Sequence, residues 1–274
     1  MLLQVRNLDV ALAGQQVLRS LQFGMCEGEL LGVLGPNGAG KSTVIKALAG
    51  DLRVAGDRVE FSGRPLASWS GRELARQRGV MPQRVDVNFP LTVEEVILLG
   101  RPPEPAARSR GIVRELMDLL DIAHLRERLV PRLSGGEQQR VQLARVLAQV
   151  WDTAGPVLLL LDECTSALDP AHQQQVFSLL KRLTLERGYG VMAVVHDLNL
   201  ASRFADRLLL MHQGHCHNTG TPSEVLTEKA LQEVYGLSAR ILMLEEGYPL
   251  VIPTDDRRVR SYTEPGNPSC RQAS

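Results

Sequence analysis

The chain has 274 residues, 44% of them hydrophobic and 23% charged, as expected of a soluble globular protein with one large α/β domain or two small ones. Lys and Arg together number 31, as do Asp and Glu, so the net charge is zero, which argues against a protein that binds nucleic acid through bulk positive charge. No apolar run approaches the roughly 18 residues that span a bilayer and no signal peptide is evident, so we expect a cytosolic chain whose membrane role, if any, goes through a partner.

A phosphate-binding loop is the first motif along the chain. Short strands are predicted at Leu3–Val5, at Val17–Phe23 and in the apolar run that ends at Leu34. The next residues fit G-x-x-x-x-G-K-[ST] at every fixed position, and a helix is predicted from Thr43 to Ala49. This strand–loop–helix context supports a nucleotide-binding loop over a chance glycine-rich turn. The expected nucleotide-binding residues are Gly35, Pro36, Asn37, Gly38, Ala39, Gly40, Lys41, Ser42 and Thr43.

Each part of this loop has an expected role. Backbone amides would hold the α- and β-phosphates, while Lys41 would reach the β- and γ-phosphates. The hydroxyl of Ser42 would bind Mg²⁺. A nucleotide with a γ-phosphate and Mg²⁺ are therefore the expected ligands of the loop.

The chain then changes from strand to helix. A strand is predicted at Asp57–Phe61, and the S-x-x-E pattern at Ser70–Glu73 starts a short helix that stops near Gly79. The segment Val80–Met81 leads to Gln83, which could sense Mg²⁺ and the attacking water. From about residue 87 to 150 the pattern is helical, with a capping box at Thr92, a loop from Arg101 to Gly111 and an amphipathic helix from Ile112 to Leu120.

A second anion site is predicted inside this helical segment. The run from Leu133 to Arg140 reads Leu-Ser-Gly-Gly-Glu-Gln-Gln-Arg. Ser134 and Glu137 have the spacing of a capping box, so a helix begins here. Gly135 and Gly136 leave the first amides of that helix open to close approach, and the positive end of a helix attracts phosphate.

Polar residues follow two predicted buried strands in the last third. Asp162 and Glu163 come after Val157–Leu161, and His196 comes after Val191–Val195. Strand ends of an open parallel sheet form its catalytic crevice. We expect Asp162 to hold Mg²⁺ through water, Glu163 to polarise the water that attacks the γ-phosphate, and His196 to donate a hydrogen bond to the γ-phosphate or to that water.

The remaining pattern completes a parallel sheet interrupted by a helical segment. Pro170 begins a helix that Gly188 ends, and Arg207–Met211 is another predicted strand. Gly214 indicates a hairpin turn, which we favour over a metal site at the nearby His212, His215, Cys216 and His217. The four cysteines, Cys26, Cys164, Cys216 and Cys270, show no paired spacing. From Thr254 onward the chain is polar, and we expect disorder there.

In this order, the motifs resemble the ATPase subunit of ATP-binding-cassette (ABC) transporters over residues 1 to about 253. The matching parts are the phosphate loop, Gln83, Leu133–Gln138, Leu158–Glu163, Ser166–Asp169 and His196. The resemblance implies a P-loop NTPase (RecA-like) parallel sheet core over 1–86 and 151–253, with an N-terminal antiparallel β subdomain and an inserted α-helical subdomain over about 87–150.

The resemblance also implies partners. Two copies of the chain would sandwich two ATP molecules, with Ser134 and Gly136 contacting the γ-phosphate held by the other copy. Gly135 would belong to the same cofactor-binding turn, and Asp169 to the segment that crosses the interface. Two transmembrane permease subunits and a periplasmic substrate-binding protein would complete the system. The chain would then lie on the cytoplasmic face of the bacterial inner membrane, and no nucleic acid is expected.

Finer features resemble the branch that imports iron complexes, haem and cobalamin, and most resemble haem-importer ATPases. The resemblance to the branch rests on Phe89–Val96, Leu99–Arg101, His196–Ala201 and Gly220–Leu226. The resemblance to haem-importer ATPases rests on Glu137–Gln149 and on an extended segment at Val150–Pro156. The alternatives are import of a ferric siderophore or cobalamin, a soluble ABC ATPase without a transporter, and a phosphoryl-transfer kinase, which has no use for the helix at Ser134.

Two positions depart from the family pattern. Leu12 stands where members often place an aromatic residue on adenine, so weaker base stacking or an aromatic from elsewhere is expected. Cys164 replaces the proline that usually follows the catalytic glutamate. A tolerated change is favoured there over a reactive thiol.

Overall fold

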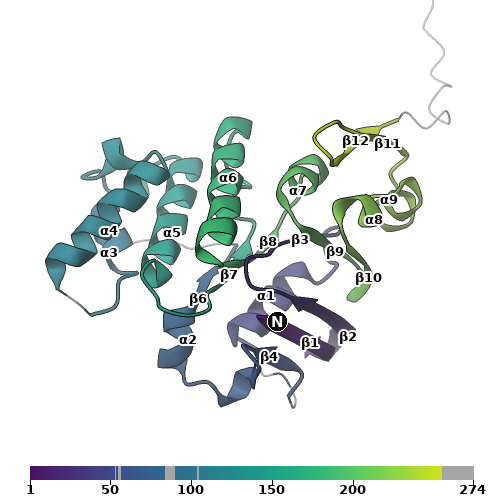
Figure 1. Cartoon of the computed structure of the whole chain (residues 1–274), viewed down its shortest axis with the longest axis horizontal. Helices are drawn as coiled ribbons and strands as arrows, with labels where there is room; N and C mark the ends of the chain where they lie inside the picture. The colour runs from purple at the N-terminus through teal and green to yellow at the C-terminus, as the bar shows by residue number, and fades with distance from the viewer. Residues whose placement is uncertain (53, 55–56, 84–89, 104, 255–274) are drawn as a thin grey trace, which may run out of the picture.

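The computed structural model describes residues 1–52, 54, 57–83, 90–103 and 105–254, which form three sheets surrounded by helices (Figure 1). In chain order the elements are β1 (Leu3–Leu12), β2 (Gln15–Met25), β3 (Leu30–Leu34), α1 (Lys41–Ala49), β4 (Val59–Phe61), β5 (Arg64–Pro65), α2 (Gly71–Gln77), β6 (Arg78–Met81), α3 (Val93–Leu98), α4 (Ala106–Leu119), α5 (Gly135–Val150), β7 (Leu158–Asp162), α6 (Pro170–Arg187), β8 (Gly190–Val194), α7 (Leu198–Phe204), β9 (Arg207–His212), β10 (His215–Gly220), α8 (Pro222–Val225), α9 (Glu228–Tyr235), β11 (Ala239–Met243) and β12 (Pro249–Pro253).

The central sheet has the strand order β10-β9-β3-β8-β7-β6, and every neighbouring pair is parallel except β10 with β9. All five residues of β3, β7 and β8 are buried, as continuous apolar runs in a parallel sheet require. The predicted parallel sheet is therefore confirmed. Its carboxyl-terminal edge carries the phosphate loop after β3, Asp162 and Glu163 at the end of β7, and His196 just after β8.

The two faces of this sheet belong to different cores, as strand β7 shows. Leu158 and Leu160 pack into the core formed with β1, β2, β4 and α1. Leu159 and Leu161 pack into the other core, with α5, α6 and α7. Alternate residues of a strand point to opposite faces, so one run of leucines serves both layers. The antiparallel sheet β2-β1-β4-β5 covers the first face, and helices cover the second (Figure 1).

Helices α3, α4 and α5 pack against one another within residues 93–150 (Figure 1). The predicted capping boxes at Ser70, Thr92 and Ser134 are all present. The predicted loop from Arg101 to Gly111 is too long, because α4 already begins at Ala106. Pro105 precedes that helix with a φ of −55°, so the last proline leads into the helix instead of excluding it.

The C-terminal part holds elements that the sequence pattern did not indicate. Gln213 and Gly214 have φ values of 49° and 82° and form the predicted turn between β9 and β10. Helices α8 and α9 and the hairpin β11–β12 follow, and Thr254 donates from its amide to Ser238 O. The tail predicted to be disordered lies, apart from Thr254, outside the described residues, as does Cys270.

Among the described helices, none is both long and apolar enough to cross a membrane.

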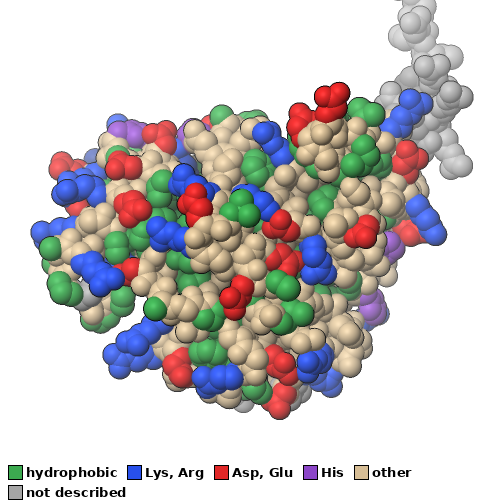
Figure 2. Space-filling model, in the orientation of Figure 1, with side chains coloured by type: hydrophobic (Ala, Val, Ile, Leu, Met, Phe, Trp, Pro, Cys, Tyr) green, Lys and Arg blue, Asp and Glu red, His purple; other side chains and the backbone are tan. Residues whose placement is uncertain are grey.

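The surface carries both signs of charge. Figure 2 shows Lys and Arg side chains interspersed with Asp and Glu over one face of the molecule, in keeping with equal numbers of basic and acidic residues in the sequence.

Candidate functional site

The phosphate loop has a backbone that its glycines alone allow. Gly35 has a φ of 146°, and a Cβ there would lie 2.3 Å from Met211 O. Gly40 has a φ of 97° and precedes α1, and no side chain among the described residues caps this helix. The first amides of α1 therefore lie at the end of a loop where an anion can approach closely.

Lys41 is held at the mouth of the same loop. Its Nζ donates to Gly35 O at 2.7 Å and to Pro36 O at 3.0 Å. Burial lowers the pKa of this ammonium, while the nearby carboxylates of Glu163 and Asp162 oppose that shift. A partly desolvated ammonium interacts more strongly with a phosphate than an exposed one does.

Asp162 and Ser42 form an oxygen-rich corner beside the loop. Asp162 is only 2% exposed, and its Oδ1 has no hydrogen-bond partner among the described residues. Burial raises the pKa of Asp162, whereas a hydrogen bond with Ser42 lowers it. A buried oxygen without a partner is costly unless a ligand completes it. Carboxylate and hydroxyl oxygens are the donors that Mg²⁺ prefers, so this corner fits the ion.

His196 and Gln83 both contact the side chain of Glu163. His196 Nε2 lies 2.7 Å from Glu163 Oε1, and Gln83 also forms a hydrogen bond with the Glu163 side chain. Burial raises the pKa of Glu163, but these hydrogen bonds and the charge of Lys41 outweigh burial, so the pKa lies below its usual value. The carboxylate is therefore ionised at neutral pH, as an acceptor for a water proton must be.

Beside these residues lies a cavity of about 260 Å³. It is lined by Val17, Gln83, Glu163 and the loop residues from Asn37 to Thr43. The structure thus brings together most of the predicted nucleotide-binding residues and two of the three predicted catalytic residues. Val17 lines the cavity although the sequence did not predict it. Leu12, the predicted neighbour of adenine, does not line the cavity and lies 39% exposed at the end of β1.

Two contacts that support the phosphate loop were not predicted. Gly214, in the turn after β9, donates from its amide to Ala39 O at 3.1 Å. Tyr235, at the end of α9, hydrogen-bonds to the backbone of Gly35, and burial raises the pKa of its hydroxyl to about 12. The sequence predicted the turn at Gly214 but not its contact with Ala39, and no motif predicted the contact of Tyr235.

The second predicted anion site lies at the start of α5. The Ser134 amide donates to Glu137 Oε2 at 2.7 Å, and the Glu137 amide donates to Ser134 Oγ at 3.3 Å. Ser134 and Gly135 are exposed. Within the described part of the chain, neither they nor Gly136 line the cavity at the phosphate loop. Asp169 caps α6 and pairs with His172 Nδ1 at 2.6 Å, with 58% of its side chain exposed.

Two further candidates are resolved by burial and geometry. Cys164 is 1% exposed, and burial raises its pKa to about 12, so the thiol is protonated and shielded and the reactive-thiol alternative is not supported. His212 and His215 face each other as partners across the β9–β10 turn. Among the described residues, no group of three or more His, Cys, Asp or Glu side chains could hold a metal ion by themselves.

Comparison with known proteins places this geometry in a family. The sequence profile of the ABC transporter family matches residues 18–166. The hemin import ATP-binding protein HmuV of Pseudomonas fluorescens is 44% identical over 254 residues, which are 92% of this chain and 99% of that protein. HmuV of Gloeobacter violaceus is 44% identical over 259 residues, with coverage of 92% and 94%. HmuV of Escherichia coli O157:H7 is 43% identical over 242 residues, with coverage of 88% and 94%.

Solved structures agree with the sequence comparison. A metal-chelate type ABC transporter in an inward-facing conformation aligns with a TM-score of 0.76 and 26% identity, over 94% of this chain and 99% of that one. The dimeric structure of a bacterial ABC transporter cassette aligns with a TM-score of 0.70 and 26% identity, over 80% and 98% of the two chains. The expected P-loop core with its flanking β and helical parts agrees with these neighbours, and the chain belongs to the ABC transporter family as one of its ATP-binding subunits.

Proposed function

We propose that this chain is the ATP-hydrolysing subunit of a bacterial importer of haem. The observation that carries hydrolysis is the meeting of Glu163, His196 and Gln83 beside the cavity at the phosphate loop. The cargo is inferred from the relatives, since proteins named for hemin import are 43–44% identical over 88–92% of this chain.

The residues divide the chemistry among them. The loop amides and Lys41 bind the phosphates, and Ser42 and Asp162 would hold Mg²⁺, which when bound neutralises charge on the β- and γ-phosphates. Glu163 accepts a hydrogen bond from the attacking water and orients it toward the γ-phosphorus. His196 and Gln83 both hydrogen-bond to the Glu163 carboxylate, so the acceptor is fixed before the reaction starts.

The active unit would be two copies of the chain. Ser134, Gly135 and Gly136 begin a helix suited to phosphate, yet they do not line the cavity of their own phosphate loop within the described residues. A second copy would present its α5 to this nucleotide and receive the same contact in return. A symmetric pair of this kind closes on itself and completes both sites. Asp169 would lie in the segment near that interface.

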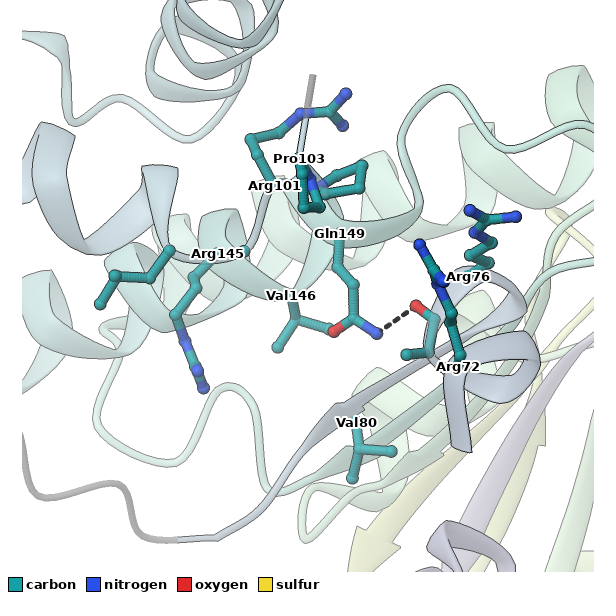
Figure 3. Close-up of a pocket in the computed structure, with 12 residues that line it drawn as sticks. Arg72, Arg76, Val80, Arg101, Pro103, Arg145, Val146 and Gln149 are labelled. Atoms are coloured by element: carbon teal, nitrogen blue, oxygen red, sulfur yellow. Dashed lines mark hydrogen bonds between the residues drawn. The ribbon is translucent and has the colours of Figure 1, made fainter. Parts of the chain in front are cut away.

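A groove between the core and the helical part would receive the permease. It has a volume of about 420 Å³ and lies among α2, β6, the end of α3 and α5 (Figure 3). Val80 and Val146 form an apolar floor, and the side chains of Arg72, Arg76 and Arg145 stand around it (Figure 3). This combination suits a cytoplasmic segment of a membrane protein that carries apolar and acidic side chains.

The groove is connected to the site through one strand. Val80 in β6 lines the groove, and Gln83, three residues later, hydrogen-bonds to Glu163. Closure of the ATP-bound dimer and movement of the permease would therefore be linked through residues 80–83. Two copies would drive two permease subunits from the cytoplasmic face of the inner membrane, with a periplasmic binding protein delivering the cargo.

Growth of a deletion strain tests the cargo. We expect a host that lacks this gene to lose growth on haem as the sole iron source and to keep growth on a ferric siderophore and its response to cobalamin. The wild-type gene should restore growth on haem, and a Glu163→Gln gene should not. Loss of growth on the siderophore alone, or of the cobalamin response alone, would assign the importer to that cargo instead.

A further inference from the structure

Gln139, in the first turns of α5, reaches out of its helix to the segment that follows β7. Its Nε2 donates to Glu163 O at 2.6 Å and to Ser166 Oγ at 3.3 Å. Its Oε1 accepts from the Ala167 amide at 3.0 Å. Both ends of the side-chain amide are therefore used on one short segment, residues 163–167, which we call the post-β7 loop.

The post-β7 loop begins with a strained residue. Glu163 has a φ of 58°, in the left-handed region that costs a residue other than glycine about 1–2 kcal/mol. Such a conformation persists only where its surroundings hold it. Within the loop, the Ser166 amide and hydroxyl donate to Glu163 O at 3.3 Å and 3.2 Å. Gln139 adds a shorter bond to the same oxygen from a different helix.

The start of α5 also packs directly on this loop. A Cβ at Gly136 would lie 3.0 Å from Ala167 O and 3.3 Å from Leu168 Cδ2, so the helix backbone approaches the loop as closely as a glycine permits. The start of α5 thus contacts the loop in two ways, by the hydrogen bonds of Gln139 and by the close packing of the Gly136 backbone. A shift of that turn moves the peptide that sets the direction of the Glu163 side chain.

We infer that Gln139 is a positioning residue that connects the phosphate-binding end of α5 to Glu163 of the same chain. This inference rests on the proposed function, in which α5 contacts the nucleotide of the other copy while Glu163 serves the chain's own nucleotide. Phosphate bound at Ser134–Gly136 would fix the first turn of α5. The hydrogen bond from Gln139 would then hold the Glu163 backbone in place. ATP in one site would in this way prepare hydrolysis in the other.

Steady-state hydrolysis by the full-length chain tests the role first. Gln139→Leu keeps the size of the side chain and removes all three hydrogen bonds, and Gln139→Glu can still accept from Ala167 but cannot donate to Glu163 O. We expect both variants to lower kcat at least about tenfold, since a misplaced catalytic group costs about that much or more. The Kd of the monomer for ATP should stay within about twofold. An unchanged kcat, or a loss of ATP binding as large as the loss of kcat, would overturn the inference.

Gln173 in α6 provides a matched comparison. Its Nε2 donates to Thr165 O and to Leu168 O, both at 3.1 Å, so it supports the same stretch without touching Glu163. Gln173→Leu removes two hydrogen bonds, and we expect it to keep kcat within about threefold. Equal losses in the Gln173→Leu and Gln139→Leu variants would show that any loosening of the loop has this effect, and would overturn a specific role for Gln139.

A double-mutant cycle separates this inference from the proposed function. If Gln139 acts through Glu163, adding Gln139→Leu to Glu163→Gln should not slow single-turnover hydrolysis further. Losses that multiply would show that Gln139 acts elsewhere. ATP-dependent dimers of Glu163→Gln, observed by gel filtration, should survive the added Gln139→Leu, and their loss in the double variant alone would make Gln139 an assembly residue. If Glu163→Gln forms no dimer with ATP, the proposed dimer fails, while the Gln139 and Gln173 comparison in the wild-type background still decides the positioning role.

Discussion

Helices α1 and α5 both have glycines at their start and are suited to phosphate, but they have opposite surroundings. Helix α1 begins in a cavity with Lys41, Glu163 and Gln83, and Gly40 at its start offers no side-chain cap. Helix α5 begins on the exposed surface, and its own Ser134 and Glu137 cap it. The start of each helix favours an anion, and at α1 the neighbouring charged side chains Lys41 and Glu163 add what a catalytic site needs.

At the cavity where α1 begins, Glu163→Gln is the change that should lower hydrolysis most. We expect hydrolysis to fall by about 10²–10⁴, because the variant keeps the shape of the side chain but cannot accept a proton from water. ATP binding should remain, since the phosphate contacts are unchanged. Phosphate release and equilibrium ATP binding measure the two effects. Full hydrolysis by this variant would remove Glu163 from the catalytic role.

Gly135→Asp tests the α5 end without disturbing the fold. A Cβ at Gly135 would lie 3.7 Å from Ala167 Cβ, an ordinary contact, and an acidic residue in the first turn favours the helix. The new carboxylate would repel a phosphate at this position, so we expect hydrolysis to fall about ten- to a hundredfold while the melting temperature holds.

Gly135→Ala serves as the control, because it adds the Cβ without the charge and should cost less than about threefold in rate. The monomer's affinity for ATP should not change in either variant. Equal rates for Gly135→Asp and wild type would show that α5 contacts no phosphate in the working enzyme.

Lys41→Ala, at the start of α1, should weaken ATP binding itself, which the changes at Gly135 leave unaffected. Among the described residues, its ammonium is the positive side chain that lines the cavity of the phosphate loop, so its loss should weaken ATP binding by about tenfold or more. Lys46→Ala, a change to a lysine in the last turn of the same helix, is the control and should bind ATP normally. Normal ATP affinity in Lys41→Ala would mean that the loop amides alone hold the phosphates.

The contrast between these ends also explains how much the sequence could predict. Glycines at fixed spacing and polar residues after buried apolar runs are local signals, so Lys41, Asp162, Glu163 and His196 could be assigned to one sheet edge before the structure was known. Capping boxes are local too, and all three predicted ones are present. The start of the helix after Pro105 was misplaced, because proline both ends and begins helices. The first strand was predicted only to Val5, although β1 continues to Leu12.

Contacts between distant segments could not be predicted in the same way. Tyr235 and Gly214 support the phosphate loop from about 200 and 175 residues away along the chain, in elements without a recognisable motif. Gln139 resembles any polar residue of a helix, and only the packing of α5 on the post-β7 loop shows its partners. Tertiary packing decides such pairs, and one sequence carries no record of it.

Acid should loosen the α5 end and should not loosen the α1 end. Hydrogen bonds from the backbone and side chain of Ser134 lower the pKa of Glu137 below its usual 4.5. A carboxylate with a lowered pKa stabilises the folded state above the unfolded pKa, and this stabilisation is lost as the pH falls through the folded value. Gly40, at the start of α1, has no side chain to titrate. Burial raises the pKa of the nearby Asp162, so its protonation does not destabilise the folded state.

Amide hydrogen exchange measures this difference. Between pH 5.5 and 3.5, after correction for intrinsic rates, protection of the Gln138 amide should fall, whereas that of Val44 in α1 should not. These amides donate to the N-cap carbonyls of Ser134 and Gly40, so they report the same turn in each helix. The effect should be small, at most about 1 kcal/mol, because the cap is exposed and solvent screens its charge. Glu137→Gln keeps a capping side chain that does not titrate, so its Gln138 protection should be flat with pH. A parallel fall in wild type and Glu137→Gln would assign the acid sensitivity to another carboxylate.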